Sequence, residues 1–159
     1  MTPTTQGSAR EWALKALARR MRTVQEIEKG LAHRGCASGA IREILENLKE
    51  LGYLDDARFS EVWVAGRSEV RLHGPLRLLR DLRAKGVEEE TAKEVIRRLL
   101  PRSREMELAR RAAEKKHRTM RGSGIQAAAA MHRHLRSRGF SPEVIHTVLS
   151  QTRFEEEEN

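Results

Sequence analysis

The sequence predicts an all-α fold in which three tandem three-helix repeats form an elongated, curved array. The first observation is a pattern, Leu-x-x-basic-Gly, that occurs three times and ends at Gly35, Gly86 and Gly139. These glycines are 51 and 53 residues apart, and a period of this size is typical of repeat proteins. The second observation is that no segment alternates apolar and polar residues as a strand does.

Apolar residues recur at matching distances after each of the three glycines and predict a helix there. Their spacings of three and four residues place them on one helical face. Trp12 and Trp63 each precede their glycine by 23 residues, whereas Lys116 occupies that position in the third copy. Each repeat is therefore expected to contain two helices, a glycine and a further helix. The matching apolar positions are Ile41, Ile44 and Leu45; Ala92, Val95 and Ile96; and Ile145, Val148 and Leu149.

Capping residues set the expected ends of these helices. Thr23 and Glu26 have the spacing of a capping box, and Asp55 or Asp56 is placed to cap the helix that opens the second repeat. Pro75 suits a first helical turn, and a glycine after a basic residue suits a left-handed helix end. The expected helices cover residues 9–21, 23–34, 38–51, 56–72, 75–85, 88–100, 103–120, 124–138 and 141–152.

The same boundaries divide the chain into five segments. We expect a disordered N-terminus over residues 1–8, repeats over 9–54, 55–101 and 102–153, and an acidic tail over 154–159. Hydrophobic residues make up 38% of the chain and charged residues 34%. This composition favours a thin-cored array over a compact globule, because small helical units must stack to share their apolar faces.

The composition also predicts a cytoplasmic protein without a membrane segment. The N-terminus lacks the apolar run of a signal peptide, and no stretch approaches the roughly 18–20 apolar residues that span a bilayer. The single cysteine, Cys36, excludes an internal disulfide. It follows a helix-ending glycine where Val87 and Phe140 stand in the other copies, so we expect it to pack in a turn.

Positive charge is concentrated in the third repeat. Residues 97–138 contain thirteen Lys or Arg and three Glu, a net charge of +10, whereas the whole chain carries +8. Such a block predicts a polyanionic partner, which is nucleic acid, an acidic protein face or both. Aromatic residues are not interleaved with it, so contact with a phosphate backbone is favoured over base stacking.

One stretch of the chain resembles a known family. Gly52-Tyr53-Leu54-Asp55-Asp56-Ala57-Arg58-Phe59, followed by Gly74-Pro75 and Leu82-x-x-Lys85-Gly86-Val87, is similar to the RecX family of bacterial regulators of the RecA recombinase. The resemblance covers roughly residues 9–152 and weakens in the third repeat. It implies three tandem three-helix repeats, binding to the RecA nucleoprotein filament, and neither enzymatic activity nor a cofactor.

On this interpretation, the protein acts as a monomer that inhibits RecA ATPase and strand exchange in recombination, DNA repair and the SOS response. Its partners are the filament and single- or double-stranded DNA, contacted through phosphates. The candidate residues for these contacts are Arg58, Arg67, Arg71, Arg77, Arg80, Arg83, Lys85, Arg110, Arg111, Lys115, Lys116 and Arg118. The residues of the structural repeat motif are Trp12, Gly35, Tyr53, Asp55, Phe59, Trp63, Gly86 and Gly139.

Physical roles can be assigned to the motif residues between the first two repeats. Tyr53 and Leu54 are expected to pack across the junction between these repeats. Phe59 and Trp63 are four residues apart on the next helix, so they are expected to face inward together.

Two other classes of function compete with this interpretation. Residues 23–55 also fit the start of a winged-helix DNA-binding transcription regulator, whose wing of two strands should follow. An enzyme is disfavoured, because the chain has no phosphate-binding loop or dinucleotide fingerprint. His132 and His134 are two residues apart on a predicted helix and therefore point to different faces, so no metal site is predicted. Glu155–Glu158 is either a solvating tail or a segment that folds over the basic block.

Overall fold

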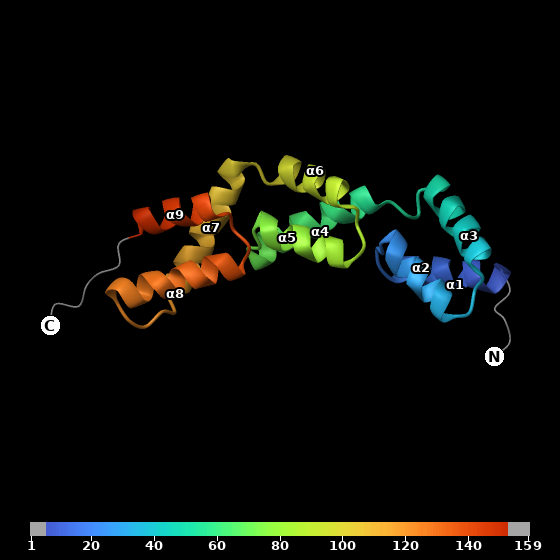
Figure 1. The fold of residues 1–159 in the computed structure, drawn as a ribbon, viewed down its shortest axis with the longest axis horizontal. Helices are drawn as coiled ribbons and strands as arrows, with labels where there is room; N and C mark the ends of the chain where they lie inside the picture. Colours follow the sequence, from blue (N-terminus) through green and yellow to red (C-terminus); the bar gives the residue numbers. More distant parts are fainter. Residues whose placement is uncertain (1–5, 153–159) are drawn as a thin grey trace.

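A computed structural model describes residues 6–152, which form nine α-helices and no strand. The array is elongated and curved, with the first and last repeats at opposite ends (Figure 1). The predicted fold class is confirmed. The helices are α1 (Gln6–Arg19), α2 (Val24–His33), α3 (Ser38–Glu50), α4 (Asp56–Arg71), α5 (Pro75–Ala84), α6 (Glu89–Leu99), α7 (Arg102–His117), α8 (Gly124–Ser137) and α9 (Pro142–Gln151).

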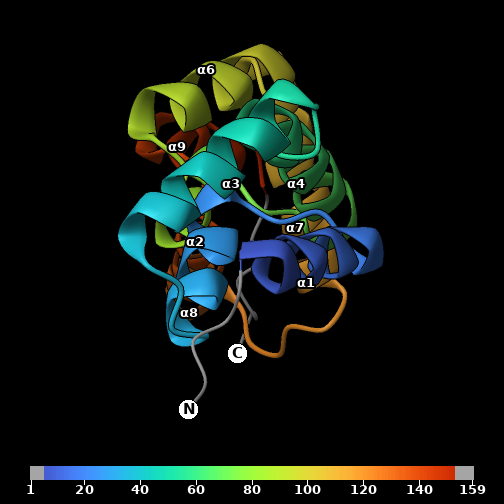
Figure 2. The same cartoon turned by 90° about the vertical axis from the view of Figure 1, so that its right-hand side faces the viewer.

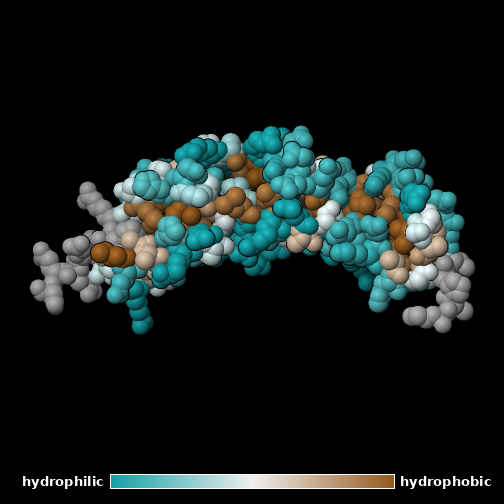
Figure 3. Space-filling view, viewed as in Figure 1, coloured by the Kyte–Doolittle hydropathy of each residue, from teal (hydrophilic) through white to brown (hydrophobic). Residues whose placement is uncertain are grey.

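Each repeat contributes one helix to each of three rows along the array. Figure 2 shows α1, α4 and α7 on one side, with α3, α6 and α9 on another. Where a winged helix would place its wing, α4 begins at once at Asp56. In Figure 3 hydrophilic residues cover most of the visible face, and apolar residues appear in the crease between the helix rows. No helix between residues 6 and 152 has the length and apolar character that a membrane crossing requires.

The predicted helix ends are largely confirmed. Gly35, Gly86 and Gly139 have φ values of 76°, 84° and 84°, in the left-handed region that glycine adopts readily. Thr23 and Glu26 form the reciprocal bonds of a capping box at the start of α2. The Asp55 carboxylate accepts a hydrogen bond from the Arg58 amide at 3.0 Å, so Asp55 is the cap of α4.

The ends of two helices differ from the prediction. Helix α1 begins at Gln6, so residues 6–8 are helical rather than disordered. The Gln6 amide donates to the Glu43 carboxylate of α3 at 2.7 Å, a tertiary contact that holds this first turn. Helix α7 ends at His117, three residues before the expected boundary. Residues 1–5 and 153–159, with the predicted acidic tail, lie outside the described part of the chain.

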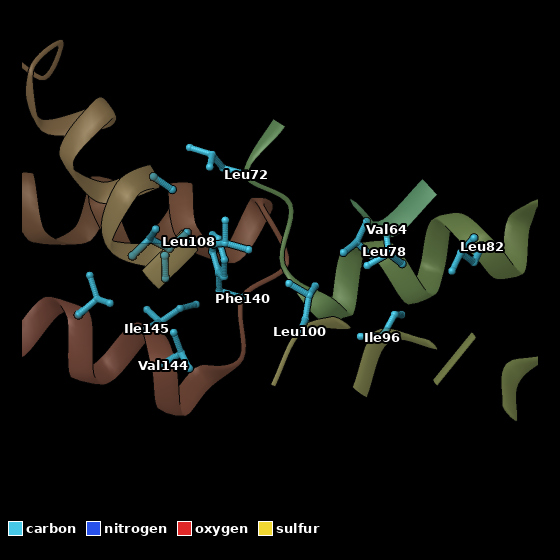
Figure 4. Packing of buried hydrophobic residues seen from close by; sticks show 14 of the residues in the cluster. Val64, Leu72, Leu78, Leu82, Ile96, Leu100, Leu108, Phe140, Val144 and Ile145 are labelled. Atoms are coloured by element: carbon cyan, nitrogen blue, oxygen red, sulfur yellow. The ribbon is translucent and has the colours of Figure 1, made fainter. Parts of the chain in front are cut away.

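The apolar side chains form two separate cores. The first repeat has its own core, which includes Ile27 and Leu31. Repeats two and three share a second core that extends without a break from Phe59 to Val148. Figure 4 shows Phe140 and Leu108 of the third repeat packed near Leu100 and Leu72 at the end of the second.

The repeated glycines also position one repeat on the next. A Cβ atom added to Gly86 would lie 2.4 Å from the Gln25 side chain of α2, and one added to Gly139 would lie 2.4 Å from Arg77 of α5. The end of each middle helix therefore packs on the start of the preceding repeat's middle helix. Gly35 has no preceding repeat, and a Cβ there would meet nothing within 4 Å.

Candidate functional site

The row of first helices carries a groove made of three adjoining cavities, which we call the first-helix groove. The first cavity, about 300 Å³, is lined by Leu14, Tyr53 and Arg58 among others. The second, about 470 Å³, includes Val62, Gly66 and Val70. The third, about 510 Å³, includes Lys115, Lys116 and Arg138. Met21 lines the first and second cavities, and Val70 and Arg71 line the second and third, so each cavity adjoins the next.

The third cavity is strongly basic. Among residues 6–152 its lining contains four cations and no carboxylate. The four come from two helices and from the residue after a third: Arg71 ends α4, Lys115 and Lys116 lie in the last turn of α7, and Arg138 caps α8. The Arg138 guanidinium donates to the Arg71 carbonyl at 2.5 Å, which fixes it across the boundary between repeats two and three.

The pKa of His134 is sensitive to burial and to the positive charges of this cavity. Burial lowers its pKa below the ordinary value, and the positive charges of Arg138 and Lys116 lower it further. The imidazole is therefore mostly neutral at pH 7, and the cavity resists further positive charge. An anion placed in the cavity would be stabilised by the same field.

The first-helix groove gathers five of the twelve candidate basic residues. These are Arg58, Arg67, Arg71, Lys115 and Lys116. Arg77 and Arg80 instead line a separate cavity of about 520 Å³, which they share with His132 and Arg136. The groove therefore excludes the candidates Arg77, Arg80 and Arg83, which recur every three residues along the sequence.

Other candidate residues are held by contacts within the chain. The Lys85 ammonium lies 3.4 Å from Glu26 and 4.7 Å from the centre of the Trp63 ring. Arg83 pairs with Glu89 at 3.5 Å. Arg111 pairs with Glu69 at 2.9 Å and Arg110 donates to Gln151 at 3.1 Å, so both connect α7 to neighbouring helices. Arg118 directly follows α7 and its side chain is exposed.

Three of the four aromatic residues of the repeat motif, Trp12, Phe59 and Trp63, pack against the two cores. Phe59 and Trp63 stack with their centroids 5.9 Å apart, as their inward orientation predicts. The Arg67 guanidinium lies 4.2 Å from the Trp63 ring centre, and Arg34 lies 4.0 Å from that of Trp12. Each ring therefore packs beneath a cation that follows it in the repeat.

The prediction that Tyr53 packs across the junction is wrong. Its side chain is 56% exposed, whereas Leu54 is buried in the first core. The reason lies in the turn at Gly52, where the amides of Tyr53 and Leu54 both donate to the Leu48 carbonyl. This turn directs Leu54 inward and leaves Tyr53 in the lining of the groove.

Several residues of the groove were not predicted from the sequence. His134 and Arg138 were not among the predicted contact residues, because only the packing of α8 against α7 brings them beside Lys115 and Lys116. Val62 and Val70 were also missed, although with Gly66 they repeat every four residues on α4. That spacing was a usable signal, since it defines a second apolar face besides that of Phe59.

Comparisons with known proteins agree with the repeat structure. Models of the first, second and third three-helix domains of RecX match residues 9–48, 55–96 and 103–149. Regulatory protein RecX from Bacillus licheniformis is 34% identical over 147 residues, which are 92% of this chain and 56% of that protein. The chain thus spans just over half the length of this Bacillus relative.

Another relative matches over nearly its whole length. Regulatory protein RecX from Pelodictyon phaeoclathratiforme is 31% identical over 94% of this chain and 91% of its own. The crystal structure of RecX from Lactobacillus salivarius has the same fold, with a TM-score of 0.84 and 24% identity over 92% of this chain and 95% of that one. With three domain models matched in order along three structural repeats, the chain belongs to the RecX family.

Proposed function

We propose that this chain is a non-enzymatic regulator that binds the RecA–DNA filament and inhibits its ATPase and strand-exchange activities. The observation that carries this proposal is the third cavity of the first-helix groove, which four cations and no carboxylate of residues 6–152 line and which adjoins the second cavity. A second support is that the relatives are named regulatory proteins. This function belongs to recombination and DNA repair in the cytoplasm.

The shape of the molecule suits a filament. Helix α4 alone has 16 residues, a length of about 24 Å at 1.5 Å per residue. Three repeats placed end to end therefore extend well beyond the length of one helix (Figure 1). An elongated monomer of this kind can contact more than one protomer of a helical filament and oppose the motions of strand exchange.

The basic cavity is suited to phosphate groups rather than to bases. Arg71, Lys115 and Lys116 present charge, and among residues 6–152 no Phe, Tyr or Trp ring on which a base could stack lines this cavity. Contacts of this kind are independent of sequence and weaken as salt rises. On single-stranded DNA the log–log salt slope is expected to be about −0.7 per phosphate contacted.

The test is an ATPase and strand-exchange assay of RecA on single-stranded DNA with increasing amounts of the purified chain. We expect both activities to fall as the chain is added, and the Lys115→Gln/Lys116→Gln variant to inhibit less. The same variant should reduce the magnitude of the salt slope by about 0.7 for each phosphate that it can no longer bind. Unchanged activities at a large molar excess of the wild-type chain would refute the proposal.

A further inference from the structure

Helix α4 exposes an apolar ridge in the second cavity of the first-helix groove. Val62 is 56% exposed and Val70 is 78% exposed, and Gly66 lies midway between them. The spacing of four residues places the three on one face of the helix. Met21, at the end of the first repeat, lines the same cavity and is 38% exposed. We call Val62, Gly66 and Val70 the α4 ridge.

No contact among the described residues explains why position 66 is a glycine. A glycine inside a helix is about 1 kcal/mol less favourable than alanine, yet a Cβ atom at Gly66 would meet nothing within 4 Å. Gly30 shows the opposite case, because a Cβ atom there would lie 2.1 Å from Trp12. A glycine between two exposed valines leaves a notch, into which a ridge of another helix can pack closely.

Cations border the α4 ridge. Arg20, Arg67 and Arg71 line the same cavity, and no carboxylate from the described part of the chain lines it. Glu61 and Glu69 each directly precede a valine of the ridge. The Glu61 carboxylate pairs with Arg98 of α6, and that of Glu69 is held by Arg104 and Arg111 of α7. An apolar centre with a cationic border is complementary to an amphipathic helix whose apolar face is flanked by Asp or Glu.

The apolar centre distinguishes this surface from the basic cavity beside it. Phosphates would leave the valine side chains in contact with water, whereas an apolar helix face would bury them. The exposed ridge also offers no aromatic ring for a base to stack on, since Phe59 is buried and Trp63 is covered on one face by Arg67. The chemistry of the α4 ridge therefore favours a protein over a nucleic acid.

We propose that the α4 ridge binds an acidic amphipathic helix of a RecA protomer, while the neighbouring basic cavity contacts DNA phosphates. This inference rests on the proposed function and divides the groove between the two components of the filament. Its apolar part provides the protein contact and the cations at its border select for acidic residues. Its third cavity provides the salt-dependent contact with DNA.

The test substitutes Gly66→Leu, which fills the notch without adding charge and places a strong helix former in a helix interior. Binding is measured to a RecA filament on single-stranded DNA and, separately, to the same DNA without RecA. We expect filament affinity to fall on the order of tenfold, as when a central residue of an interface is disrupted, and DNA affinity to stay unchanged. Ile125→Ser is the control, because Ile125 is 86% exposed in α8 and its replacement removes an exposed apolar side chain without adding charge, so neither affinity should change.

The outcomes separate this inference from the function on which it rests. Filament affinity of the Gly66→Leu variant equal to that of the wild type overturns the inference and leaves the proposed function intact. Equal losses for filament and free DNA also overturn it, because they would make the α4 ridge a DNA surface. A wild-type chain that binds DNA but has no affinity for the filament overturns both.

Discussion

The two junctions between repeats use the same positions but different chemistry. At the first junction the Thr23 hydroxyl donates to the Lys85 carbonyl at 2.7 Å, and the Val24 amide donates to the Asp56 carboxylate at 2.9 Å. At the second, the Gly74 amide donates to the Arg138 carbonyl at 2.7 Å. The first junction separates two cores, whereas the second lies within one continuous core.

This difference shows how one repeat pattern produces cooperative folding units of unequal size. A shared apolar core makes neighbouring repeats unfold together, because exposing one face also exposes the other. A junction of hydrogen bonds and ion pairs couples its neighbours less strongly. We therefore expect repeats two and three to form one cooperative unit, to which repeat one is joined as a separately unfolding unit.

The largest expected effect comes from breaking the shared core with Phe140→Ala. Phe140 is 1% exposed and lies where repeats two and three meet. Replacing a buried phenylalanine by alanine typically costs about 3–5 kcal/mol, because apolar packing disappears and a cavity remains. Hydrogen exchange should show α4–α9 losing protection together, while α1–α3 keep theirs.

The matched control is Ile27→Ala, which creates a cavity in the core of the first repeat. It should weaken protection in α1–α3 by about 2–5 kcal/mol and leave α4–α9 nearly unchanged. If both variants reduced protection uniformly along the chain, the array would be a single cooperative unit and the contrast between the junctions would be wrong.

The first junction should be most sensitive to Thr23→Ala. Thr23 is completely buried, caps α2 and donates across the junction to Lys85. Loss of the cap and of the second hydrogen bond should together cost about 2 kcal/mol. Urea unfolding should show the loss in the transition of the first repeat, and Thr23→Ser should restore most of it. A serine variant as unstable as the alanine variant would argue against the hydroxyl.

The second junction should respond to acid through His73. This side chain is buried with no hydrogen-bond partner for Nδ1 among residues 6–152. Burial, followed by the charges of Arg77 and Arg138, lowers the pKa of His73 to about 4. In the unfolded chain His73 takes up a proton near pH 6.5, whereas in the folded chain it stays neutral until about pH 4. The free energy of unfolding therefore falls as pH drops from 6.5 toward 4.

The expected loss between pH 7 and pH 5 is about 2 kcal/mol, from a pKa difference of this size. Urea unfolding at the two pH values should show the loss in the transition of repeats two and three. The His73→Gln variant has no such group, so the difference between its two stabilities should be smaller by that amount. An identical acid response in the variant would rule out His73 as its origin.

The sequence predicted the repeat but not the inequality between its junctions. Glycines, caps and apolar spacings are local, so they sufficed for nine helices and for Asp55 and Thr23 as caps. The division into two cores depends on which side chains meet across a junction, which a one-dimensional pattern does not contain. For the same reason only part of the groove could be predicted. Arg67 and Arg71 share a helix and could be grouped from the sequence, whereas His134 lies beside Lys116 only because of tertiary packing.

The smallest expected effect concerns the ion pair at the first junction. Burial alone would raise the pKa of Glu26, but its hydrogen bonds with Arg20 and the Thr23 amide and the charge of Lys85 outweigh this and leave the pKa below its ordinary value. The stabilisation is thus present above pH 4.5 and is lost as pH falls through the lowered pKa. This window lies below that of His73, so acid should affect the second junction before the first.

Lys85→Met tests this order, because it keeps an apolar stem beside Trp63 and removes the charge near Glu26. The pair is partly exposed, so the loss at pH 7 should be below about 1 kcal/mol and should appear in the transition of the first repeat. Between pH 7 and pH 5 the loss should stay constant, and it should shrink only once Glu26 protonates. A loss that already shrank above pH 5 would place the titrating group elsewhere, because Glu26 remains ionised throughout that range.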